Sequence, residues 1–406
     1  METISACKPE LLSPAGDMER LEMALCYGAD AVYLAGQSFG LRASAGNFDN
    51  EQLAAAGEMC RAAGAKMYVT VNVLPHEGEL SRLPEFLERA ADAGADGFII
   101  ADLGVMALAK RYAPRVPLHV STQLGVVNSE TARVLHDMGV SRVVLAREMS
   151  LEEIAALRAK TPRELELEAF VHGAMCVSFS GRCLLSNYMT GRDANGGECA
   201  QPCRWKYHLV EEKRPGEYFE ISEDGGTHIM NSRDMCMIEH IPELLEAGVS
   251  SLKIEGRMKS AYYAAIATYA YRGAIDDCLA GRPFDRTWLD ECMKISHRQY
   301  CTGFYFGDPG QYYPDAMYFA DASVCAVAEG RTDCEGRAVL TQRNKFAQGD
   351  TLELVRPHEK PVRFTCGELR NADGETVPSA CRAMMELHMA LPVPAPRLAI
   401  VRKLKT

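Results

Sequence analysis

A recurring unit dominates the first 260 residues of this chain: a helical stretch rich in Ala and Glu ends at a glycine, and a short apolar run follows. Glycine is typical of a helix C-terminus, and Val- and Ile-rich runs between helices are typical of parallel strands buried on both faces. The apolar runs cover residues 10–13, 31–35, 67–72, 97–101, 118–121, 142–146, 165–171 and 251–255. Eight such units predict an α/β chain folded as a (β/α)8 barrel. An open doubly wound sheet is the alternative, but no run is followed by the G-x-G-x-x-G segment of its dinucleotide-binding form.

The seventh predicted unit is much longer than the others. About 80 residues separate the end of its strand from the start of the eighth, so we expect an insertion over residues 172–230. Two helices are predicted within residues 261–297, at 261–279 and 285–297. From about residue 310, β-branched segments alternate with turn sequences, as in a small antiparallel β-barrel. We therefore expect a barrel domain over residues 1–309, including the insertion and these helices, and a β-barrel-like domain over residues 310–406.

The charge balance limits how this chain could hold nucleic acid. Its 406 residues include 44 Lys and Arg against 55 Asp and Glu, a net charge of −11. Because proteins that bind nucleic acid through their overall field are normally basic, such a role here requires a local basic patch. No apolar window is long enough to span a membrane, and the first residues lack the pattern of a signal peptide. We therefore expect a cytoplasmic protein whose 15 cysteines are thiols or metal ligands rather than disulfides.

Four cysteines gather in the predicted insertion: Cys176, Cys183, Cys199 and Cys203 lie within 28 residues. Their spacing is C-x6-C-x15-C-x3-C. A zinc ribbon is built from two pairs of closely spaced cysteines, and the six residues between Cys176 and Cys183 are too many for such a pair. Irregular spacing with Gly and Pro nearby is typical of an iron–sulfur cluster, because backbone amides approach the cluster sulfides closely. The residues alone therefore favour an iron–sulfur cluster, with a zinc site and plain thiols as the alternatives.

Polar side chains follow the predicted strands at the end where barrel enzymes place their functional groups. Glu255 and His172 are candidates for proton transfer. Arg42, Lys253 and Arg257 are candidates for binding an anion, because arginine in particular pairs with carboxylates or phosphates through two parallel hydrogen bonds. The other polar residues predicted at this mouth are Asn72, Asp102, Ser121, Gln123, Arg147 and Lys259. Together they predict a small anionic ligand; the alternative is that they pair with one another at the barrel rim.

A basic patch is predicted around the four cysteines. Arg192 and Arg204 belong to it, and Tyr188 and Trp205 lie between its charges. Arginines attract phosphates and aromatic rings stack on bases, so this arrangement is typical of RNA binding. The alternative is that the arginines only balance the negative charge of the thiolates.

A hydrolase motif also occurs in the sequence. Residues 36–40 match the G-x-S-x-G elbow of hydrolases. That elbow opens a helix at once, whereas residues 41–48 have the composition of a loop. We therefore do not expect Ser38 to be a catalytic nucleophile.

Several longer motifs resemble a known family. ELLSPAG at residues 10–16, EAFVHGAMC at 168–176 and SGRCLLS at 180–186 resemble the peptidase U32, or collagenase-like, family. CAQPCR at 199–204, NSRDM at 231–235 and KIEGRMKS at 253–260 resemble its tRNA hydroxylation branch. The similarity extends over essentially the whole chain, including the predicted β domain.

This resemblance implies a tRNA-modifying hydroxylase. Members of that branch are needed for 5-hydroxylation of the wobble uridine in the tRNA anticodon loop. Their reaction uses prephenate rather than dioxygen. The resemblance also implies an iron–sulfur cluster, of the [4Fe–4S] type, on Cys176, Cys183, Cys199 and Cys203. Prephenate carries two carboxylates, which suits an Arg-rich mouth. Related branches hydroxylate ribosomal RNA or ubiquinone precursors, and the older family name implies a peptidase; these stay as alternatives.

Overall fold

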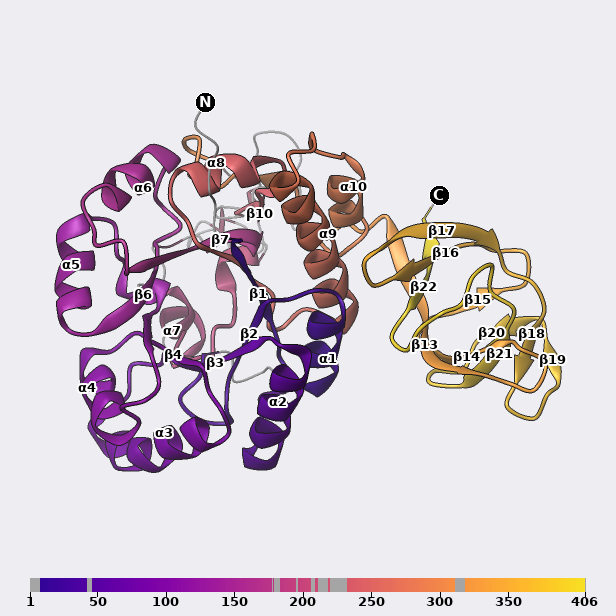
Figure 1. Ribbon diagram of the computed structural model, residues 1–406, viewed down its shortest axis with the longest axis horizontal. Helices are drawn as coiled ribbons and strands as arrows, with labels where there is room; N and C mark the ends of the chain where they lie inside the picture. Colours follow the sequence, from indigo (N-terminus) through magenta and orange to yellow (C-terminus); the bar gives the residue numbers. More distant parts are fainter. Residues whose placement is uncertain are drawn as a thin grey trace.

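The computed structural model describes residues 8–41, 46–176, 178, 183–194, 196–205, 209–210, 218–219, 232–310 and 318–405. Eight of its strands form a parallel barrel: β1 (Glu10–Pro14), β2 (Ala31–Leu34), β3 (Lys66–Val71), β4 (Gly97–Ile100), β5 (Leu118–Val120), β6 (Val140–Val144), β7 (Glu166–Ala174) and β11 (Ser251–Ile254). Because β11 pairs with both β7 and β1, the sheet is closed. The helices surround it in Figure 1. The predicted (β/α)8 barrel is confirmed.

The barrel helices begin and end at residues whose local chemistry explains the sequence pattern. They are α1 (Met18–Cys26), α2 (Asn50–Ala63), α3 (Leu83–Asp92), α4 (Leu103–Tyr112), α5 (Ser129–Asp137), α6 (Leu151–Arg158), α8 (Ile241–Glu246) and α9 (Ala261–Leu279). The side chains of Asp49 and Ser150 accept hydrogen bonds from the first turns of α2 and α6. Gly28, Gly94 and Gly139, each just beyond the end of a helix, have positive φ, a conformation that favours glycine.

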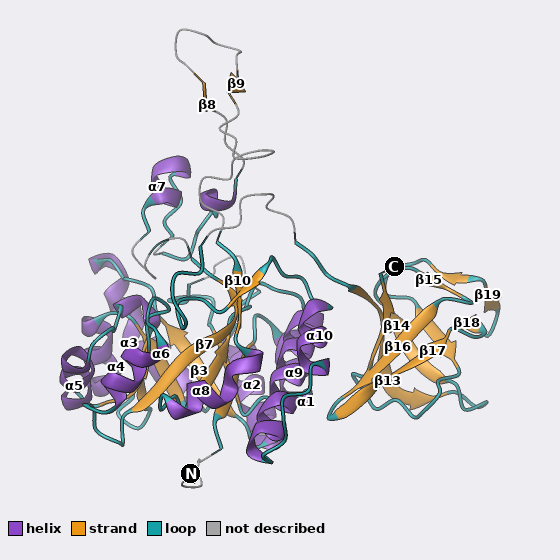
Figure 2. Cartoon of the chain, turned by 90° about the horizontal axis from the view of Figure 1, so that it is seen from above, coloured by secondary structure: helices purple, strands orange, loops and turns teal. Residues whose placement is uncertain are grey.

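The long segment between β7 and β11 contains more elements than a regular βα unit. The last residues of β7, 172–174, pair antiparallel with β10 (Asp234–Cys236), which in turn pairs with β12 (Tyr300–Cys301). This segment also contains α7 (Leu185–Thr190), the 3-10 turn η3 (Pro202–Arg204), β8 (Leu209–Val210) and β9 (Tyr218–Phe219). Figure 2 shows α7 above the ends of the barrel strands.

A bulge in β7 changes the direction in which its side chains point. Lys253 pairs with Phe170, but the next residue, Ile254, pairs with His172, so β7 carries one extra residue at this point. An extra residue shifts the two-residue alternation of a strand and sends the following side chains to the opposite face. Phe170 therefore lines the inside of the barrel mouth, whereas His172 packs against Tyr263 and Tyr271 of the outer helix α9.

The C-terminal domain is an antiparallel sheet with a core of its own, as predicted. Its order is β17–β16–β22–β13–β14–β21–β18–β19. The strands are β13 (Ala322–Thr332), β14 (Ala338–Gln342), β16 (Thr351–Arg356), β17 (Glu359–Thr365), β18 (Leu369–Asn371), β19 (Thr376–Val377), β21 (Glu386–Met389) and β22 (Ile400–Leu404), with β15 (Phe346–Ala347) and β20 (Ser379–Ala380) paired separately. Leu340, Leu352 and Leu387 are fully buried at its centre.

The two domains are joined by buried polar contacts. Tyr27 of α1 donates hydrogen bonds to the carbonyl oxygens of Val355 and Leu398, at 3.2 and 3.0 Å. Arg402 of β22 binds both carboxylate oxygens of Glu291, in α10 (Thr287–Met293), at 2.6 and 2.7 Å. Figure 1 shows this domain beside α9 and α10. No helix in the described part of the chain has the length and apolar character that a membrane crossing requires.

Candidate active site at the mouth of the barrel

The C-terminal ends of the barrel strands open into a cavity of about 420 Å³. Strand-end residues such as Thr70, Ser121 and Phe170 form its lower wall. Residues of the insertion, among them Leu185 and Pro202, form its upper wall. The cavity therefore lies where barrel enzymes bind their substrates.

All four clustered cysteines line this cavity: Cys176, Cys183, Cys199 and Cys203. Cys176 is exposed and the other three are half-buried. A single zinc ion with bonds of about 2.3 Å holds tetrahedral sulfurs about 3.8 Å apart. Among the described residues, no three of these four sulfurs lie within 4.8 Å of one another. Four thiols around one cavity form a donor set that soft metal ions accept.

The charged side chains in the described wall are mostly cationic. Arg147, Lys253, Arg257 and Lys259 line the cavity, against one carboxylate, that of Glu255. Arg257 is buried and donates hydrogen bonds to Thr70 Oγ1 at 2.9 Å, to Asn47 Oδ1 at 3.2 Å and to the carbonyl oxygen of Leu41. The described wall therefore carries more cationic than anionic side chains, which favours an anionic ligand.

Two side chains hold the carboxylate of Glu255 in position. Its Oε2 atom lies 3.6 Å from Nη2 of Arg147 and 3.4 Å from the hydroxyl of Tyr33. Arg147 itself donates to the carbonyl oxygen of Ala174 at 2.8 Å and stacks on Phe170, with Cζ 3.7 Å from the ring centroid. Arg147 and Tyr33 thus fix Oε2 of Glu255 at the wall of the cavity.

Lys253 has a second role inside the barrel. Its Nζ atom lies 2.6 Å from Oε1 of the fully buried Glu168, whose other oxygen binds Arg142 at 3.1 Å. Burial lowers the pKa of the neighbouring His119 well below its usual value, and the charges of Arg142 and Lys253 lower it further. The floor of the cavity is therefore a buried ion network around a neutral histidine.

Several predicted residues do not meet at this cavity. The prediction that His172 lies at the mouth is not supported by its position, because the bulge in β7 turns its side chain, 1 % exposed, away from the cavity. Arg42 and the side chain of Arg204 lie outside the described residues, and Arg192 is exposed on the insertion. Asp102 does not line the cavity; it caps α4 by accepting a hydrogen bond from the amide of Val105.

The structure also adds residues that the sequence did not point to. Tyr318 lines the cavity from the segment before the C-terminal domain, and Nζ of Lys259 lies 4.1 Å from the centroid of its ring. Nothing in the local sequence distinguishes Tyr318 from other tyrosines, since only the fold brings it to Lys259.

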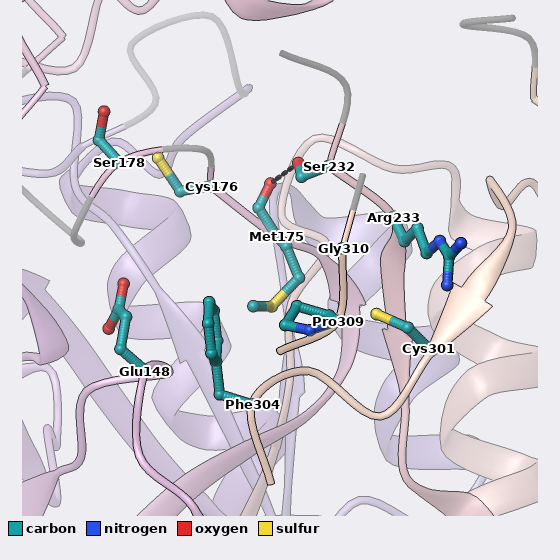
Figure 3. Close-up of a pocket in the computed structure, with 10 residues that line it drawn as sticks. All are labelled: Glu148, Met175, Cys176, Ser178, Ser232, Arg233, Cys301, Phe304, Pro309 and Gly310. Atoms are coloured by element: carbon teal, nitrogen blue, oxygen red, sulfur yellow. Dashed lines mark hydrogen bonds between the residues drawn. The ribbon is translucent and has the colours of Figure 1, made fainter. Parts of the chain in front are cut away.

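A smaller pocket of about 80 Å³ adjoins the cavity. Figure 3 shows Cys176, Met175 and Cys301 among its lining residues, with Ser232 donating a hydrogen bond to the carbonyl oxygen of Met175 at 2.9 Å. Since Cys176 lines both spaces, the thiol of Cys301 is a further sulfur close to the cysteine cluster.

The G-x-S-x-G match does not form a nucleophile elbow. Ser38 is exposed, and the next helix, α2, begins only at Asn50. The geometry that such an elbow requires is therefore absent at Ser38.

Comparison with known proteins decides the family. Residues 16–329 match the sequence model of Peptidase family U32, and residues 321–402 match that of the Peptidase family U32 C-terminal domain. The chain belongs to peptidase family U32. The motif resemblance is thereby confirmed.

Relatives of this U32 chain carry names that describe RNA hydroxylation. It is 38 % identical to "tRNA hydroxylation protein P" of Escherichia coli (strain K12), over 92 % of this chain and 91 % of that protein. It is 39 % identical to "tRNA hydroxylation protein P1" of Bacillus subtilis (strain 168), over 92 % and 89 %. It is also 36 % identical to "23S rRNA 5-hydroxycytidine C2501 synthase" of Escherichia coli (strain K12), over 69 % of this chain but 41 % of that protein.

Proposed function

We propose that this chain hydroxylates C5 of the wobble uridine of tRNA, with prephenate as co-substrate and an iron–sulfur cluster as cofactor. The observation that carries the proposal is a single cavity whose wall contains both four cysteines and four cationic side chains. Relatives named for tRNA hydroxylation, matched over nine-tenths of both chains, support tRNA as the substrate.

The cysteines supply the ligands for the cluster. Cys176, Cys183, Cys199 and Cys203 provide four soft thiolates, and Gly197 and Pro202 line the same wall, so little side-chain bulk separates the backbone from a cluster there. When bound, an iron–sulfur cluster supplies electron transfer beside the substrate. The thiolates also fix its position at the upper wall, opposite the strand ends.

The cations bind the dicarboxylate. Arg257 and Arg147 present guanidinium groups to the cavity, and Lys259 and Lys253 add positive charge. Guanidinium forks match carboxylates in a planar, two-donor geometry that ammonium groups lack. We therefore assign the directional contacts to the arginines and the general attraction to the lysines.

Glu255 accepts the proton that leaves C5 of the uridine. Replacement of the hydrogen on C5 by a hydroxyl group requires that the proton of C5 leave, and Glu255 is the carboxylate in the described wall of the cavity. Arg147 and Tyr33 hold its Oε2 atom in place, so this oxygen is the acceptor that we assign.

Nucleoside mass spectrometry tests the proposal. The chain is expressed in a bacterial strain that lacks its own tRNA hydroxylation proteins, and total tRNA and rRNA are digested separately. We expect 5-hydroxyuridine to return in tRNA with the wild-type chain and with Cys325→Ser, but not with Cys199→Ser. It should also fail to return in a host that cannot synthesise prephenate. A hydroxylated base in rRNA alone, or no hydroxylated base, overturns the assignment of tRNA as substrate.

A further inference from the structure

A second set of metal-binding side chains lies outside the barrel mouth. His172 at the end of β7, Cys236 at the end of β10 and Cys292 in α10 bring one ligand atom each within 4.8 Å of one another. All three side chains are buried, with Cys292 fully inaccessible and His172 1 % exposed. The set does not line the cavity described above, so it is separate from the four clustered cysteines.

The hydrogen bonds of His172 leave one ring nitrogen free for a ligand. Its Nε2 atom lies 3.5 Å from the hydroxyl of Tyr300, and that hydroxyl donates to the carbonyl oxygen of Cys292 at 3.0 Å. Since the tyrosine proton is used by the carbonyl, Nε2 carries a proton and donates to the tyrosine oxygen. The lone pair then resides on the buried Nδ1, and the side chain of Cys236 lies close enough to His172 to share a hydrogen bond with it.

A metal-binding histidine commonly has this arrangement, in which one nitrogen is held by a hydrogen bond and the other faces the ion. Three side chains that each carry a possible metal ligand would be unnecessary if the residues only filled space. A small apolar side chain at position 236 or 292 would serve that purpose equally well.

Charge balance identifies the kind of ion. Two cysteines that lose their protons carry two negative charges, and a neutral imidazole adds none, so a divalent cation makes the whole group neutral. Neutrality matters here because an uncompensated charge in an interior of low dielectric is costly. Two thiolates and one imidazole form a ligand set that zinc accepts, with water as the fourth ligand.

We propose that His172, Cys236 and Cys292 bind a zinc ion that fastens β7 and β10 to α10. Binding releases the two thiol protons and forms two Zn–S bonds and one Zn–N bond, with no change of oxidation state. The ion would hold the returning strand β10 against the outside of the barrel, and His172 precedes Cys176 by four residues in the sequence. Its role is structural, and it does not depend on the reaction at the mouth.

Metal analysis of paired variants tests this site. The full chain is purified anaerobically from zinc-supplemented medium, and zinc and iron are measured on the same sample. We expect about one zinc per chain in the wild type, a loss of at least tenfold in Cys236→Ser and Cys292→Ser, and retained iron in both. Cys60→Ser, a matched buried cysteine, should keep the zinc. Cys176→Ser should keep the zinc but lose the iron.

The opposite pattern overturns the proposal. Zinc that disappears in Cys176→Ser but persists in Cys236→Ser would belong to the mouth cysteines. A wild-type chain without zinc, or with a Cys236–Cys292 disulfide in the native protein, would also exclude the site. If the cysteine variants fail to fold, zinc-edge X-ray absorption of the wild type decides, because two sulfurs at about 2.3 Å with nitrogen at about 2.0 Å support the site and four sulfurs do not.

Discussion

The ammonium group of Lys253 lies 2.6 Å from a carboxylate oxygen of Glu168, and both side chains are buried inside the barrel. The other oxygen of Glu168 binds Arg142, which also binds Glu10. Burial alone would raise the pKa of Glu10, but the charge of Arg142 and its hydrogen bond hold that pKa below its usual value. Lys253 is therefore part of an ion network that supports the floor of the active site.

Glu168→Gln should destabilise the barrel strongly. The change leaves Lys253 without its carboxylate in a buried position, and breaking one side of a buried ion pair costs about 3–5 kcal/mol. Urea unfolding should show this loss, and the double variant Glu168→Gln/Lys253→Met should recover part of it, because it removes the stranded charge. Glu130→Gln, in an exposed pair with Arg133, should change stability by less than about 1 kcal/mol. Losses that simply add in the double variant would show that the pair is not coupled.

Arg257→Lys should weaken prephenate binding although it preserves the charge. Lysine cannot present the planar pair of donors, and losing one charged contact costs about 1.5–3 kcal/mol, or roughly tenfold to a hundredfold in affinity. Calorimetric titration with prephenate measures this. Arg298→Lys is the matched control, because Arg298 is equally buried and binds Asp234 but does not line the cavity; it should lower stability and leave affinity unchanged. Equal affinities in both variants would remove Arg257 from the binding site.

Single substitutions of Cys176, Cys183, Cys199 and Cys203 by serine should each lose iron, because a hard hydroxyl binds a cluster iron far less well than a soft thiolate. Iron and acid-labile sulfide are measured on anaerobically purified protein. Cys301→Ser is the closest control, since Cys301 shares the small pocket with Cys176, and it should keep its iron, as should Cys325→Ser. Retention of iron in all four cluster variants would contradict the ligand assignment.

The sequence predicted those parts of the fold in which one local signal dominates. All eight barrel strands were predicted within a few residues, because buried parallel strands read as continuous apolar runs. The helix α9 runs from Ala261 to Leu279, as predicted. By contrast, α10 ends at Met293 rather than at residue 297, because His297 leaves the helix to pair with the backbone of Phe319. That contact depends on a distant segment and has no local signature.

In the candidate site too, the sequence predicted the features that have a local signal and missed those that depend on distant contacts. The spacing of the four cysteines singled them out, and the structure places all of them on one cavity. His172 was predicted at the mouth by counting along a regular strand, and one extra residue in β7 reversed its direction. Cys236 and Cys292 stand 56 positions apart and outside the cluster of four cysteines, so only the fold brings them together with His172.

The exposed aromatic residues of the insertion should bind the anticodon loop. Tyr188 on α7 is 86 % exposed and Trp205 is 41 % exposed, and both lie close to cavity-lining residues of the insertion such as Leu185 and Cys203. Large exposed aromatic side chains beside an anionic-ligand site are suited to stacking on unpaired bases, and stacking contributes about 1–3 kcal/mol per base. Arg192, also exposed, adds a contact to phosphate.

Tyr188→Ala and Trp205→Ala should each weaken binding of an anticodon stem-loop by roughly tenfold to a hundredfold. Arg192→Ala should reduce the slope of log affinity against log salt by about one, because one fewer counterion is released.

The controls are Phe284→Ala and Arg286→Ala, which change exposed residues just beyond the far end of α9. That helix begins beside the mouth at Ala261 and, over its 19 residues, ends roughly 28 Å away at 1.5 Å per residue. Fluorescence anisotropy at several salt concentrations measures all five variants. Equal losses of affinity in the insertion variants and in the two controls would mean that RNA is held by the general surface. Losses confined to the insertion variants would place the anticodon loop over the cavity that the four cysteines line.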